Sequence, residues 1–115
     1  MVECRLIVVP PGGGEADYSL DFNLPAVPRT GEFITVSRED RDYGYECFYV
    51  RSVWWEMSYP SSGPSATKSD KGKIKMIAIE AETARGPHMT EEHKRMCDAY
   101  EARGKKPKEF ADTMY

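Results

Sequence analysis

Histidine and cysteine are the residue types in this chain best suited to bind a metal or to act as a nucleophile with its base. The sequence has two histidines and three cysteines, of which His88, His93 and Cys97 lie closest together. On a helix, His93 and Cys97 would share a face because they are four residues apart. Cys4 or Cys47 would then be available as a further metal ligand.

Helix packing explains this cluster better than metal binding or catalysis does. His93 and Cys97 would share their face with Met96 and Tyr100, which is typical of a stripe that packs on a core. A Cys–His pair would also need oxyanion donors and a group to orient the base, and the sequence offers neither nearby. The cysteines are widely spaced and form no C-x-x-C pair. We therefore predict reduced thiols, no metal and no cofactor.

Other catalytic motifs are weak as well. Gly12–Gly14 is not followed by Lys and Ser/Thr at the spacing of a phosphate-binding loop. The carboxylates between 39 and 46 alternate with arginines, as in a solvated loop, and no acidic spacing matches a calcium loop. The sequence therefore predicts a protein that is not an enzyme.

A dense run of aromatic residues between 43 and 59 is the most informative feature. Rings on a small sheet can stack on single-stranded bases, but nucleic-acid-binding folds surround them with Lys and Arg. Here Glu46 and Glu56 flank the rings and Arg51 stands alone. Core packing accounts for most of the rings, and a protein-binding patch for the rest. The predicted partner-binding residues are Tyr43, Tyr45, Phe48 and Trp54.

The charge distribution also gives little support for nucleic-acid binding. The formal net charge is −3, with 9 basic and 13 acidic residues in 1–84 and 7 and 6 in 85–115. One basic cluster follows the predicted helix and comprises Arg103, Lys105, Lys106 and Lys108. Such a cluster is typical of a solvated helix end, where cations complement the helix dipole.

Runs of β-branched and aromatic residues predict about five strands. Residues 4–9 end at prolines and glycines, 18–24 alternate apolar and polar residues, and 32–36 follow a proline-containing break. The long runs 46–59 and 74–81 should pair as neighbours. The sequence therefore predicts an α+β fold: an antiparallel meander, open or curled into a small barrel, with a C-terminal helix packed against it.

The C-terminal part changes to helical character. After Ile79 there is no further Leu, Ile or Val; Thr90 can cap a helix and Gly104 can end it. We expect a single domain over 1–115, with a β core at 1–82, a helix at 88–104 and a tail at 105–115. Residues 61–72 have almost no apolar side chains and are predicted to form a mobile loop.

Hydropathy gives an expectation for the compartment. No stretch approaches the ~20 apolar residues of a membrane-spanning helix, and the N-terminus has no basic region followed by an apolar one. We expect a cytoplasmic protein without membrane contact.

Two patterns predict which side chains are buried. In a half-buried strand over 18–24, one face should be formed by Tyr18, Leu20, Phe22 and Leu24, with Ser19, Asp21 and Asn23 exposed. In a regular strand over 46–59, Trp55 should share the core face with Cys47, Tyr49, Val53, Met57 and Tyr59. Trp54 should lie opposite with Phe48 and Val50, a face that the helix or a second chain should cover.

Two functional hypotheses remain at this point. The first is a small non-catalytic protein-binding domain, either an inhibitor encoded by a mobile element or a self-associating module that forms a homo-oligomer. The alternative is a single-stranded nucleic-acid-binding module that uses the sheet aromatics and the basic cluster at 103–108. The absence of a catalytic motif and the mild acidity favour the first.

Overall fold

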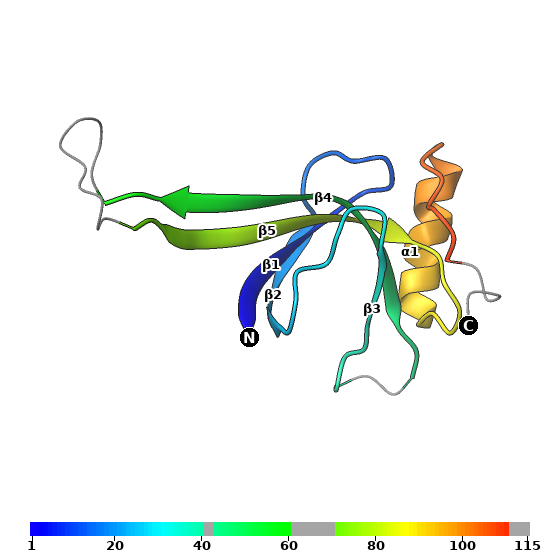
Figure 1. Cartoon of the computed structure of the whole chain (residues 1–115). Coiled ribbons are helices and arrows are strands. Elements are labelled where there is room, and N and C mark those ends of the chain that lie inside the picture. The colour runs from blue at the N-terminus through cyan, green and yellow to red at the C-terminus, as the bar shows by residue number, and fades with distance from the viewer. Residues whose placement is uncertain (41–42, 61–70, 111–115) are drawn as a thin grey trace.

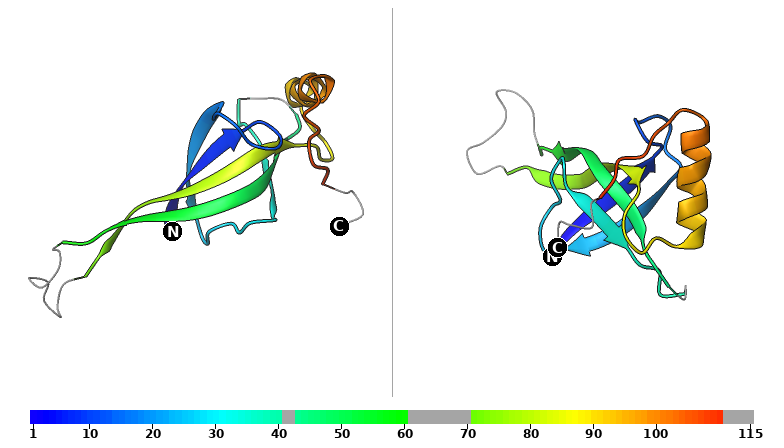
Figure 2. Two further views of the ribbon diagram at one scale, coloured as in Figure 1. Left: turned by 90° about the horizontal axis from the view of Figure 1, so that it is seen from above. Right: turned by 90° about the vertical axis from the view of Figure 1, so that its right-hand side faces the viewer.

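A curled five-stranded sheet and one helix make up the fold in the computed structural model, which describes residues 1–40, 43–60 and 71–110. The sheet is a half-barrel with the helix standing at one end (Figures 1 and 2). The strand order is β2-β1-β5-β4-β3. The elements are β1 (Val2–Val9), β2 (Tyr18–Leu24), β3 (Phe33–Val36), β4 (Glu46–Ser58), β5 (Lys73–Ala84) and α1 (Glu91–Ala102).

The sheet is mixed, which corrects the prediction of an antiparallel meander. β1 pairs antiparallel with β2 but parallel with β5, whereas β5–β4 and β4–β3 are antiparallel. β1 lies inside the sheet because it is apolar on both faces: Leu6 and Val8 are buried on one side and Val9 on the other. Such a run is typical of an interior strand rather than of the edge at which a meander begins. The predicted pairing of β4 with β5 is confirmed.

The core lies on the concave face of the half-barrel. It centres on Leu6, Phe48, Val50, Ile77 and Ile79, all of which are almost completely buried. β2 packs against this core through its alternate residues, so the predicted alternation over 18–24 is confirmed. Its even-numbered side chains are partly buried and the intervening ones exposed.

β4 breaks its own alternation at Arg51. Val50 and Ser52 pair with successive residues of β5, so Arg51 is an extra residue in the register, a β-bulge. A bulge shifts the side-chain alternation by one residue. The prediction of one regular alternation over 46–59 is therefore wrong.

The bulge decides which aromatic residues enter the core. Before it, Phe48 and Val50 face the core, and after it Val53 and Trp55 take that side, since Trp55 pairs with the buried Ile77. Cys47 and Tyr49 therefore lie on the outer face, opposite to the prediction. Trp54 and Trp55 point to opposite faces, as expected for neighbours in a strand.

Helix α1 begins at its predicted cap. The Thr90 hydroxyl oxygen accepts a hydrogen bond from the His93 amide at 3.1 Å. The buried stripe consists of His93, Cys97 and Tyr100, and the Tyr100 hydroxyl donates to Asp17 at 2.6 Å. Burial, and then this hydrogen bond, raises the pKa of Tyr100 to about 12. The helix is thus fixed to the β1–β2 connection.

Two further expectations concern the polar loop and the membrane. Most of the loop predicted at 61–72 lies outside the described residues, which resume at Lys71. Within the described ranges, no helix has the length and apolar character needed to cross a bilayer.

Candidate functional site

β4 and β5 continue together beyond the rest of the sheet. β1 pairs with β5 no further than Ala78, and β3 pairs with β4 over its first four residues. From Trp55 to Ser58 the described pairing is between β4 and β5 alone. Figure 1 shows this ribbon projecting away from the body at the end opposite α1, and the molecule measures 56 × 29 × 27 Å. Residues 53–60 and 71–78 are named the arm.

The arm exposes large apolar side chains on both of its faces. Trp55 and Met57 continue the core side of β4, whereas Trp54 points to the other side. A two-stranded ribbon without a packed face is marginally stable in water, and clustered apolar side chains indicate an interaction surface. The exposed fractions are 44% for Trp54, 48% for Trp55, 68% for Met57, 56% for Tyr59 and 55% for Ile74.

Helix α1 does not cover Trp54, although the helix was one of the two predicted covers. α1 packs on the opposite end of β4, where His93 contacts Phe48 with ring centroids 5.8 Å apart. Phe48 and Val50 are fully buried, but Trp54 keeps 44% of its surface exposed. The expectation that the helix covers Trp54 is therefore wrong, because the bulge separates Trp54 from the Phe48 face and the arm carries it away from the body.

The arm is basic, whereas the rest of the chain is acidic. It carries Lys71, Lys73, Lys75 and Glu56, a net charge of +2. Because the whole chain carries −3, the residues outside the arm sum to −5. Lys75 lies 3.8 Å from Glu56, and both side chains are well exposed. An acidic surface would therefore be attracted to the arm.

A groove of about 490 Å³ lies at the base of the arm, where β1 and β5 diverge. Its β1 wall includes Val2, Glu3 and Cys4, and Asp21 of β2 contributes a second carboxylate. The opposite wall is the arm segment 74–77. Arg5 and Lys75 line it too, so the groove combines an apolar lining with two carboxylates and two cations. Asp21 is ion-paired with Arg5 at 2.9 Å.

The four predicted partner-binding residues do not form one surface. Phe48 is fully buried in the core, so it cannot contact a partner. Tyr43 and Tyr45 are exposed but precede β4, at the end of that strand opposite to Trp54. Of the four residues, Trp54 lies on the arm.

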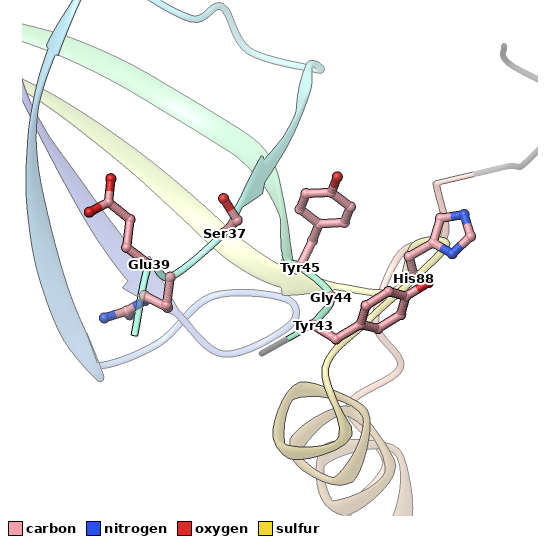
Figure 3. A pocket seen from close by; sticks show the side chains of 7 residues that line it. Ser37, Glu39, Tyr43, Gly44, Tyr45 and His88 are labelled. Carbon is pink, nitrogen blue, oxygen red and sulfur yellow. The ribbon is translucent and has the colours of Figure 1, made fainter. Parts of the chain in front are cut away.

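Tyr43 and Tyr45 line a separate cavity of about 520 Å³. Figure 3 shows Ser37 and Glu39 on one side of it and the two tyrosines and His88 on the other. The Tyr45 amide donates to the His88 carbonyl oxygen at 2.8 Å, which joins the segment before β4 to the connection before α1. This cavity and the arm are distinct features of the surface.

An ion-pair cluster beside this cavity holds the half-barrel together. Arg38 donates to Glu46 at 2.6 Å, and the Tyr18 hydroxyl donates to the same carboxylate at 3.1 Å. Burial, and then the nearby Glu46 charge, raises the pKa of Tyr18. The carboxylate thus links β2 to β4 across the open side of the sheet.

The basic cluster lies at the α1 end, away from the arm. Arg103 stacks over the Tyr100 ring at 4.9 Å, and Lys108 lies 3.5 Å from Glu82 and 5.0 Å from the Tyr49 ring centre. Lys105 and Lys106 are exposed. The cluster and the arm aromatics therefore do not form a single nucleic-acid surface.

Sequence reasoning missed the role of Arg51. The Glu82 side chain is 3% exposed, and the Arg51 guanidinium lies 3.6 Å from its carboxylate. Lys108 approaches the same carboxylate from the C-terminal segment. A buried carboxylate requires opposite charges, so the bulge at Arg51 places a cation where the outer face needs one.

The His–Cys cluster is a packing site at the end of the β4–β5 pair. The His93 Nε2 atom lies 2.8 Å from the Ala84 carbonyl oxygen and 3.2 Å from the Cys47 amide nitrogen. Cys97 donates its thiol to the same carbonyl at 3.6 Å. Burial raises the pKa of Cys47 and of Cys97 to about 11, so both are protonated at neutral pH and are poor nucleophiles. In the described part of the chain, no three His, Cys, Asp or Glu side chains could hold a metal ion.

The burial of the cysteines predicts their reactivity. Cys4, Cys47 and Cys97 are all free and buried, so we expect none of them to react with Ellman's reagent in the native protein. All three should react after denaturation. Ser58→Cys, which adds an exposed thiol on the arm, is the positive control and should react at once. Rapid native titration of any of the three original thiols would contradict the packing described here.

The arm itself was not predicted, although its signal is present in the sequence. The runs that became β4 and β5 form strands of 13 and 12 residues, whereas β1 has 8 and β3 has 4. Long strands beside short ones must project beyond them. The exposure of Met57 and Ile74 follows from this difference in length.

Comparison of the chain with protein-family models, curated proteins and solved structures gives no match. The arm and the groove at its base are therefore the features from which a function can be inferred.

Proposed function

We propose that this chain is a non-catalytic protein-binding domain that docks through its arm. The observation that carries the proposal is the arm's five large apolar side chains, which are 44–68% exposed on a ribbon that, in the described structure, has no third strand beside it beyond Ala78. Burying the remaining half of such a side chain stabilises a complex by roughly 1 kcal/mol, because full burial of a large apolar side chain is worth about 1.5–3 kcal/mol. A protein partner that covers the arm would supply this burial.

The composition of the arm favours a protein over a nucleic acid. Two of its exposed apolar residues, Met57 and Ile74, are not aromatic. Their side chains cannot stack on bases as rings do. Aromatic residues and methionine are enriched in the centres of protein interfaces. Lys75 lies beside Glu56, and the basic cluster at 103–108 lies at the other end of the molecule.

Site-specific photo-crosslinking tests the proposal in cells that naturally produce the chain. A photoreactive amino acid at position 57 should give protein adducts, whereas the same group at position 43, which is also exposed, should give few. Introducing Trp55→Ser should reduce the adducts from position 57 about tenfold, since central aromatic anchors dominate interface energy. Thermal unfolding of the Trp55→Ser variant verifies that the fold is retained.

Three results would overturn the proposal. Equal labelling from positions 43 and 57 would mean that the arm is not a specific surface. If Trp55→Ser did not reduce the adducts, binding would not depend on the apolar face of the arm. Adducts from position 57 that disappear on nuclease treatment would assign the arm to nucleic acid instead.

A further inference from the structure

The arm has a free strand edge on the side of β4. β3 pairs with the first four residues of β4, Glu46–Tyr49, and the segment just before β3 makes two hydrogen bonds with Val50. Among the described residues, no backbone group other than those of β5 is hydrogen-bonded to β4 beyond Val50. Residues 53–58 therefore form an exposed strand edge about 20 Å long.

The direction of the backbone groups on this edge follows from Val50. Its amide donates to the Glu32 carbonyl oxygen and its carbonyl oxygen accepts from the Gly31 amide, both at 2.9 Å, so its N–H and C=O point away from β5. Val50 also faces the core. Within one strand, residues that face the same side of the sheet direct their backbone groups toward the same edge, because both properties alternate from residue to residue.

Beyond the bulge at Arg51, three residues therefore direct unpaired backbone groups outward. The bulge shifts both alternations by one residue, so the core-side residues of the arm are Val53, Trp55 and Met57. Their N–H and C=O groups face the open edge. An exposed row of such donors and acceptors is a template for the addition of another strand.

The opposite edge of the arm, formed by β5, is protected against such an addition. Lys73 and Lys75 lie two residues apart on it. Lys75 is also an extra residue opposite the step from Glu56 to Met57, and so forms a second bulge. Lysines and bulges both hinder the pairing of an exposed strand with another chain. Over 53–58, β4 has no lysine and no extra residue, so the β4 edge is the one open to a new strand.

A strand added to this edge would contact both faces of the arm at once. Side chains of a strand alternate between the two faces of a sheet. Those on one face would cover Trp55 and Met57, and those on the other would cover Trp54. A flat partner surface would leave one of the two tryptophans exposed. The free edge and the two apolar faces are therefore satisfied together by one extended segment.

We infer that the arm binds an extended segment of its protein partner, which adds to the β4 edge as a further strand of the sheet. The inference rests on the proposed function and names the part of the partner that binds. Main-chain hydrogen bonds to β4 would supply affinity, and alternate side chains would supply specificity. Because Trp54 and Trp55 lie on opposite faces, the segment should be apolar at successive positions rather than at every second one.

Mapping of photo-crosslinks from both faces of the arm tests the inference in cells that naturally produce the chain. A photoreactive amino acid is placed at position 54 in one variant and at position 57 in another. Both should give adducts with the same protein, and mass spectrometry of the adducts should place them within one stretch of about six residues, the usual length of a strand. Adducts in separate parts of the partner, or from one position alone, would overturn the inference.

A comparison of Met57→Pro with Met57→Ala tests the use of the backbone. Both variants lose the methionine side chain, but only proline also lacks the N–H group. Met57→Ala should reduce the adducts from position 54 about fivefold, and Met57→Pro about tenfold further, because a partner carbonyl would be buried without a donor. Equal losses in the two variants would refute strand addition at this edge.

Thermal unfolding verifies that the N–H group of Met57 faces the open edge. A proline is tolerated on an edge strand where its missing N–H would face solvent. Met57→Pro and Met57→Ala should therefore unfold at the same temperature. A lower temperature for Met57→Pro would mean that this N–H bonds to β5, and would overturn the edge assignment.

Failure of this inference can be told apart from failure of the proposed function. Adducts from position 57 that do not lie in one strand-like segment would overturn strand addition and leave the arm as a binding surface. Absence of protein adducts from both positions would overturn the proposed function as well. Adducts that join two copies of this chain would make a second copy the occupant, and would overturn its assignment to a different protein.

Discussion

Replacing Phe48 with alanine is expected to lower the free energy of unfolding by about 3–5 kcal/mol, the range for a large aromatic side chain removed from a packed core. Phe48 is fully buried, and its neighbours belong to β4, β5 and α1 at once. The void left by its ring would be bounded by three elements that cannot all move inward. Domains of this size are stable by about 5–15 kcal/mol, so the variant should lose a large part of its stability.

Trp54→Ala is the matched control because it removes a larger ring from the same strand. Trp54 is 44% exposed on the arm, so its loss should cost about 1 kcal/mol in the monomer. Urea denaturation at low protein concentration measures both variants without a contribution from association. A loss for Trp54→Ala as large as that for Phe48→Ala would mean that the arm is packed against the body.

The contrast between Phe48 and Trp54 shows which structural features the sequence pattern can predict. Alternation over 18–24 correctly predicts the buried face of β2, and the Thr90 cap correctly predicts where α1 begins. Both features are local, since they depend on side chains a few residues apart. Local patterns of this kind are visible in one sequence.

Features that depend on distant residues were not predicted. The parallel pairing of β1 with β5 joins segments about seventy residues apart, and no local pattern indicates its direction. The bulge at Arg51 was missed because the contact that Arg51 makes there is with Glu82, a carboxylate on another strand. Without the bulge, Phe48 and Trp54 seem to share a face, which is why both were assigned to one partner-binding site.

The candidate site also combines features that are visible locally in the sequence with features that depend on distant strands. The aromatic run between 43 and 59 covers β4, but only the lengths of the neighbouring strands separate its buried half from its exposed half. The arm lysines were not associated with the tryptophans because they lie on β5. Strand pairing brings Lys73 opposite Ser58 and so makes the tip of the arm basic.

His93 joins helix and sheet at the other end of the molecule. Its side chain is 2% exposed, and Nε2 contacts the Ala84 carbonyl oxygen and the Cys47 amide, where the β4–β5 pairing ends. Nδ1 is buried and has no hydrogen-bond partner among the described residues. A protonated ring would therefore bury an N–H without an acceptor.

Burial is the main cause of a lowered His93 pKa, and the positive charge of Arg85 adds to it. The hydrogen bond that the ring donates to the Ala84 carbonyl oxygen and the negative charge of Glu46 oppose this shift without reversing it. In the unfolded chain the pKa is the ordinary 6.5. Below pH 6.5 the unfolded state therefore binds a proton that the folded state does not, until the pH falls below the folded-state pKa.

The free energy of unfolding should consequently fall as the pH decreases below 6.5, by at most about 1.4 kcal/mol per pH unit from this one group. The contribution is fully present above pH 6.5 and constant there. His93→Gln should remove this part of the pH dependence, in addition to a loss of about 1–3 kcal/mol at pH 7.5 from the altered hydrogen bonds and packing. Urea denaturation at a series of pH values between 5 and 8 measures both effects.

His88→Gln is the matched control, since His88 is the other histidine of the chain and its side chain is exposed. This variant should keep the full decrease in stability below pH 6.5, because the buried His93 is still present to resist protonation. The slope of the free energy of unfolding against pH separates the two roles of His93. Loss of a purely structural residue would lower the free energy of unfolding equally at every pH and leave the slope unchanged. Parallel curves for the wild type and His93→Gln would therefore refute a neutral, buried His93 as the origin of acid sensitivity.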